Sequence, residues 1–88
     1  MITPAQALEI TEEIKTLGLN DSVLSTLRQK YKPIHFTYCM DDDIANAKAI
    51  VETDGFNLYL IDGREHCLCL TNDFDIATGI VIAEIIPD

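Results

Sequence analysis

Two histidines and three cysteines are the side chains of this 88-residue chain that could bind a soft metal or carry redox chemistry. They fall on two predicted strands, which carry His35, Cys39, His66, Cys67 and Cys69. Cys67 and Cys69 would project from one face of a strand about 6.5 to 7 Å apart, which suits neither a disulfide nor two sulfurs that converge on one zinc ion. The spacing therefore favours structural cysteines, and a metal or redox site from these five residues is the alternative.

Three consecutive aspartates form the other group that could do chemistry. Asp41, Asp42 and Asp43 follow a predicted strand, where carboxylates can hold Mg²⁺ or Ca²⁺, but the glycine and glutamate of a calcium loop are missing from the positions that follow. Capping or a solvated turn is the favoured role. The sequence also contains no nucleophile motif and no glycine-rich phosphate loop, since its four glycines are scattered. We therefore expect no enzymatic activity and no cofactor.

The negative charge is concentrated in the second half of the chain. Residues 1–40 are neutral, whereas residues 41–88 carry eleven acids against Lys48 and Arg64 and supply the whole net charge of −9. Such a surface would repel a nucleic-acid backbone. It either keeps the protein soluble or forms an acidic face that binds a larger, basic protein partner. The expected partner-binding residues, all in predicted turns at strand ends, are Asp41, Asp42, Asp43, Asp73 and Asp75.

Composition predicts a single folded domain over residues 1–88. Apolar residues make up 48% and charged residues 24%, as in ordinary globular domains. The apolar runs span only a few residues, so we expect no membrane segment. Without a secretory signal at the amino terminus, and with an odd number of cysteines, the expected location is the cytoplasm.

Two helices are predicted at the amino-terminal end. Thr3, Pro4 and Gln6 form a capping box with proline at the first helical position. An apolar stripe of helical period follows at Ala7, Ile10, Ile14 and Leu17, and Gly18 ends the helix. Asn20 or Asp21 can cap a second helix that Pro33 ends. The short connection predicts an antiparallel or steeply crossed helical hairpin.

Beyond Pro33 the apolar period changes to two, which predicts strands. The first covers residues 34–40. Residues 43–51 form either a short helix or an extended segment, and a helical turn followed by irregular chain is favoured. Residues 56–61 and 66–71 flank Asp62-Gly63, a hairpin signal. A three-residue loop that pairs Leu60 with Arg64 is preferred to a two-residue loop that pairs Ile61 with Arg64. The last strand, residues 79–86, is apolar on both faces and should be central or covered.

These elements predict an α+β fold in which an N-terminal helical hairpin packs on one face of a mainly antiparallel four-stranded sheet. Two short helices cover only one face of such a sheet. The other face would need a homodimer joined through strand 79–86, or residues 43–54 folded back across it.

Four stretches of the sequence resemble a family of small, uncharacterised proteobacterial proteins. They are His35–Cys39, Phe56–Leu60, His66–Leu68 and Ala77–Glu84, and the resemblance covers roughly residues 34–85. It implies a bacterial cytoplasmic accessory protein without an assigned activity, with a link to metalloenzyme or nitrogen metabolism. It assigns no functional residue.

Overall fold

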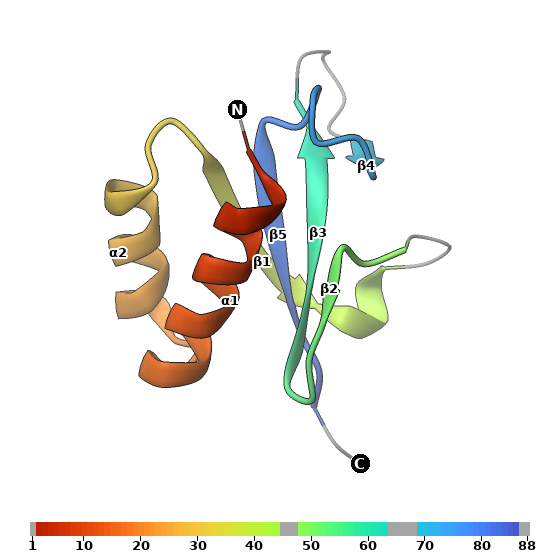
Figure 1. The fold of residues 1–88 in the computed structure, drawn as a ribbon. Coiled ribbons are helices and arrows are strands. Elements are labelled where there is room, and N and C mark those ends of the chain that lie inside the picture. Colours follow the sequence, from red (N-terminus) through yellow and green to blue (C-terminus); the bar gives the residue numbers. More distant parts are fainter. Residues whose placement is uncertain (1, 45–47, 64–68, 87–88) are drawn as a thin grey trace.

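A computed structural model describes residues 2–44, 48–63 and 69–86 (Figure 1). Two helices precede a set of short strands, so the α+β class is confirmed. The elements are α1 (Pro4–Leu17), α2 (Asp21–Lys30), β1 (His35–Met40), the 3₁₀ helix η1 (Asp41–Asp43), β2 (Val51–Glu52), β3 (Phe56–Asp62), β4 (Cys69–Thr71) and β5 (Gly79–Glu84).

The ends of both helices follow from local capping chemistry. The Thr3 hydroxyl accepts from the backbone N–H of Gln6, whose side chain accepts from the Thr3 N–H, so the predicted capping box is present. Gly18, with a φ of 91°, ends α1 in a conformation that side-chain-bearing residues rarely adopt. Asn20 caps α2 by accepting from the N–H of Val23 at 3.0 Å.

The sheet differs from the predicted one in strand number and direction. Among the described residues it has five strands: four lie in the order β1-β5-β3-β2, and β4 pairs with the same edge of β3 as β2 does. β1 runs parallel to β5, whereas β3 is antiparallel to β5, so the sheet is mixed. The prediction of four strands omitted the two-residue β2. The prediction of a mainly antiparallel sheet missed the parallel pairing of β1 with β5, because hydrophobic periodicity carries no information on which distant strands pair.

The connection between β3 and β4 is wider than either predicted turn. Asp62 pairs with Cys69, whereas the predicted turns paired Arg64 with Leu60 or with Ile61. Both predicted registers are therefore wrong. Paired residues of antiparallel strands share a face, so Cys69 lies on the helix side of the sheet, but its side chain is exposed.

A close approach between β1 and β5 requires glycine at position 79. Gly79 pairs with His35, and a Cβ atom at Gly79 would lie 2.8 Å from the carbonyl oxygen of His35. At the outer edge of β1, Arg28 of α2 donates from Nη2 to the carbonyl oxygen of Phe36 at 3.2 Å.

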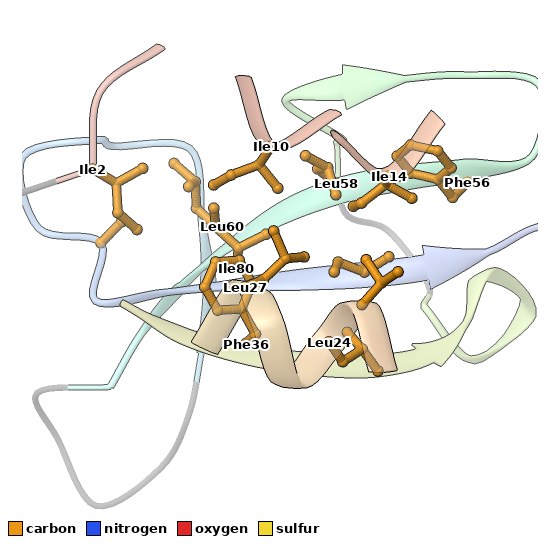
Figure 2. Close-up of a cluster of buried hydrophobic side chains, with 13 residues drawn as sticks. Ile2, Ile10, Ile14, Leu24, Leu27, Phe36, Phe56, Leu58, Leu60 and Ile80 are labelled. Carbon is orange, nitrogen blue, oxygen red and sulfur yellow. The ribbon is translucent and has the colours of Figure 1, made fainter. Parts of the chain in front are cut away.

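The main core lies between the helices and one face of the sheet (Figure 2). The helices lie side by side over this face, with α2 against β1 and α1 against β2. From the sheet come Phe36, Phe56, Leu58, Leu60, Ile80 and Ile82; from the helices and the segment before them come Ile2, Ile10, Ile14, Val23, Leu24 and Leu27. Each large aliphatic side chain that is fully buried here contributes roughly 1.5 to 3 kcal/mol to stability.

The opposite face of the sheet is covered by the chain itself. Its buried cluster consists of Tyr59, Ile61, Val81 and Ala83. Ile44 and Ala49, from the connection between β1 and β2, pack against this cluster. Of the two alternatives, the structure therefore shows the one in which residues 43–54 fold back, with residues 45–47 outside the described part. The helical turn lies at Asp41–Asp43.

The homodimer through residues 79–86 was predicted because one apolar face of the sheet was expected to be uncovered, and that reason no longer holds. Val81 and Ala83 are only 7% and 0% exposed, and β5 is paired on both sides. Self-association itself stays a prediction.

Candidate functional site

The sheet topology gathers carboxylates at one end of the sheet. Met40 at the end of β1 and Phe56 at the start of β3 both pair with Glu84 at the end of β5, and the N–H of Ile85 donates to the carbonyl oxygen of Gly55. The segments that follow β1, follow β2 and end β5 therefore meet here. We call their acidic residues the acidic end: Asp41, Asp42, Asp43, Glu52, Asp54 and Glu84. Residues 40–44, 52–56 and 84–86 contain no lysine or arginine.

Asp41 is fixed to the sheet by its side chain. Its Oδ1 accepts from Asn57 Nδ2 at 3.1 Å and from the Tyr59 hydroxyl at 3.0 Å. Tyr59 is buried, and burial and the hydrogen bond to Asp41 raise the pKa of its phenol. Asp41 thus anchors η1 and the start of the segment that covers the second face, which differs from the expected capping or solvated role.

The neighbouring carboxylates of the acidic end are displayed to solvent. Asp42, Asp43, Glu52 and Asp54 are exposed. Asp54 lies in a tight turn that Thr53 organises, because the Thr53 hydroxyl donates to the carbonyl oxygen of Phe56 at 2.6 Å and accepts from its N–H at 3.0 Å. The backbone that carries Asp54 is therefore held in place by hydrogen bonds.

Asp73 and Asp75 do not join the acidic end. They lie between β4 and β5, on the side where β5 begins, whereas η1 lies where β5 ends. The Asp73 carboxylate accepts from the N–H of Asp75 at 2.9 Å, which forms an Asx turn. The expected set of five aspartates is thus divided between two ends of the sheet.

A small pocket lies beside Glu84 on the helix side. It has a volume of about 290 Å³ and is lined by Leu19, Asn20, Asp21, Leu24, Tyr38 and Glu84. The Tyr38 hydroxyl donates to the Glu84 carboxylate, and this bond raises the pKa of Tyr38. We call this recess the Tyr38 pocket; its size suits one side chain better than a drug-sized ligand.

The sequence analysis missed four acids of this region. They are Asp21, Glu52, Asp54 and Glu84. Asp21, Glu52 and Glu84 each lie at the end of a helix or strand and Asp54 lies in the turn after β2, and such positions are the signal that drew attention to Asp41–Asp43. The pairing of distant strands that brings Glu84 beside the ends of β1 and β2 is not visible in the sequence.

The soft ligands do not come together where the structure describes them. His35 and Cys39 lie four residues apart on β1, which corresponds to about 13 Å along a strand, and Cys69 lies on β4, beyond β5 and β3. His66 and Cys67 lie outside the described residues. Among the described side chains, no group of three or more histidines, cysteines or acids is placed to hold a metal ion.

The Cys39 thiol is half-buried near the aspartates of η1. Burial, followed by the charges of Asp43 and Asp41, raises its pKa. A raised pKa keeps the thiol protonated and lowers its reactivity. The metal or redox role stays a prediction, and metal analysis of protein purified without chelator tests it.

Comparisons with known proteins give the chain a family. Within the described residues, no helix is long and apolar enough to cross a membrane. No curated protein and no solved structure matches the chain. The model of a family of unknown function, DUF6129, matches residues 8–85. This agrees with the resemblance to an uncharacterised family, whose bacterial source stays a prediction. Since the match extends over most of the sequence, the chain belongs to the family of unknown function DUF6129.

Proposed function

We propose that this protein is a small binding module without catalysis of its own, whose acidic end docks onto the basic surface of a larger protein. The observation that carries the proposal is the Tyr38 pocket. It places the carboxylates of Asp21 and Glu84 beside an aromatic ring, at the end of the sheet where β1 leads into η1.

The lining of the Tyr38 pocket suits an arginine or lysine of the partner. The cationic head group would contact the two carboxylates and the face of the Tyr38 ring, which attracts cations. The aliphatic stem would contact Leu19 and Leu24, which also line the pocket. One inserted basic side chain would then serve as the anchor of the interface.

The exposed residues of the acidic end would act mainly on the rate of association. Asp42, Asp43 and Asp54 are exposed, so each pairing with a partner cation contributes little energy by itself. Together they attract a basic surface over about 8 Å at physiological ionic strength. Because Asp41 and Thr53 hold the backbone of this end in place, little ordering is needed on binding.

A peptide of alternating arginine and glycine provides a probe for the acidic end. The double variant Asp21→Asn with Glu84→Gln should weaken its binding about tenfold, from two partly exposed charge contacts. The control Asp73→Asn with Asp75→Asn removes the same charge at the other end of the sheet and should change the affinity less than about twofold. Fluorescence anisotropy at low and physiological salt measures both.

The result that speaks against the proposal is equal weakening in the two double variants. The peptide would then respond to total charge alone, and the negative charge would serve solubility. Light scattering of the same samples tests the predicted self-association.

A further inference from the structure

A second recess, distinct from the acidic end, lies where β1, β3 and β5 meet near the end of α2. It has a volume of about 740 Å³, within the range of small-molecule sites. We call it the Arg28 groove. Its lining includes three cationic or basic side chains, Arg28, Lys32 and His35, together with the exposed hydroxyl-bearing Thr37.

This lining is unusual for a chain with a net charge of −9. The described residues that line the groove include no aspartate or glutamate. In the described part of the chain, no carboxylate forms an ion pair with Arg28 or Lys32, whereas Lys15 and Lys30 pair with Glu12 and Glu13. Arg28 and Lys32 therefore face one recess without a counter-charge from the described residues.

The hydrogen-bond donors of the groove differ in whether they are already used within the protein. Arg28 uses one guanidinium nitrogen to donate to Phe36 O, which fixes the head group at the edge of β1 and leaves other N–H donors. Thr78, in contrast, is occupied, because its hydroxyl accepts from the N–H of Gly63 at 2.9 Å. Pro33 and Ile34 line the groove as well, so it also offers apolar contact area.

We propose that the Arg28 groove binds a small phosphate monoester. A phosphate monoester presents three oxygens and nearly two negative charges at neutral pH, which matches a guanidinium, an ammonium and a hydroxyl better than the two oxygens of a carboxylate do. The organic part of the ligand packs on the apolar wall. The negative charge elsewhere on the protein is screened beyond about 8 Å, so the local donors decide the binding.

Adenosine 5′-monophosphate is the probe for this site, with adenosine as its uncharged counterpart. Titration followed by amide shifts in ¹⁵N-labelled protein should show saturable changes at Thr37, Gly63 and Gly79, and adenosine should leave these amides unchanged. Lys32→Gln, an exposed position without an ion pair among the described residues, should weaken binding about fivefold. Lys15→Gln makes the same change in charge away from the groove and should alter the affinity less than twofold.

Several outcomes would overturn the proposal. Equal losses in the two lysine variants, non-saturating shifts spread over both helices, or equal shifts with adenosine would remove the specific site. Citrate bound as tightly as the nucleotide would remove the assignment to phosphate. If a glutamate hexapeptide alone shifts Phe36 and Tyr38, at the outer edge of β1, the groove would belong to a peptide site instead.

Discussion

Replacing Asp41 by alanine should lower the free energy of unfolding by about 2 to 4 kcal/mol. The substitution removes two hydrogen bonds to one carboxylate oxygen, at 3.1 Å from Asn57 and 3.0 Å from Tyr59. A hydrogen bond to a charged group contributes about 1.5 to 3 kcal/mol, and the half-buried position of Asp41 places each bond at the lower end of that range. Tyr59, only 6% exposed, would also lose its partner.

Urea unfolding followed by circular dichroism measures this loss, and the neighbouring aspartate supplies the control. Asp42→Ala removes an equal charge from the same 3₁₀ helix at an exposed position, and its effect should stay within about 0.5 kcal/mol. A double-mutant cycle of Asp41→Ala with Tyr59→Phe should give a coupling energy of about 1 kcal/mol or more.

Two results would refute the anchoring role of Asp41. One is an equal loss of stability in the Asp41 and Asp42 variants. The other is additive behaviour in the cycle, which would show that the Tyr59 hydroxyl does not depend on the carboxylate. In either case the hydrogen bonds of Asp41 would contribute little to the stability of the fold.

Three further predictions concern β1, β5 and the titrating groups near them. Gly79→Ala should lower the free energy of unfolding by about 1 to 3 kcal/mol, because the new Cβ would lie 2.8 Å from a backbone oxygen. Gly55→Ala, where a Cβ would have nothing within 4 Å, should change the free energy of unfolding little. Equal losses in urea unfolding would contradict the packing argument. Folding raises the pKa of the Tyr59 phenol, so the stability contributed by this group is fully present below its unfolded pKa of about 10 and is lost as pH rises through its folded pKa. The free energy of unfolding, measured from neutral to alkaline pH, should therefore fall less steeply in Tyr59→Phe than in the unmodified protein. Iodoacetamide should modify Cys39 more slowly than a small free thiol at mildly alkaline pH, as read by peptide mass spectrometry, and an equal rate would show that burial and Asp43 do not suppress its thiolate.

The elements of this fold could be predicted from sequence where local chemistry determines them. Thr3 and Gln6 lie within one turn of each other, so the start of α1 follows from the residues that form it. The alternation around Phe36 likewise predicts β1 without knowledge of its neighbours. The double-faced apolar pattern of residues 79–86 correctly indicated a covered, central strand.

Features that join distant segments could not be predicted in this way. The pairing of His35 with Gly79 is parallel, and no local pattern distinguishes it from an antiparallel one. The Asp62-Gly63 signal is also local, and tertiary pairing overrides it, since β4 joins β3 only at Cys69. The grouping of five expected aspartates failed for the same reason: strand ends were recognised, but not which ends meet.

The two edges of the sheet have a consequence for the behaviour of the protein at high concentration. Open strand edges are templates on which further chains can add and fibrils can grow. Along β3, the edge is divided between two short strands, β2 and β4, instead of one long one. At the other edge, the Arg28 side chain occupies an outward carbonyl of β1 and places a positive charge in the path of an incoming strand. Intermolecular strand addition is thus hindered at both edges of the sheet.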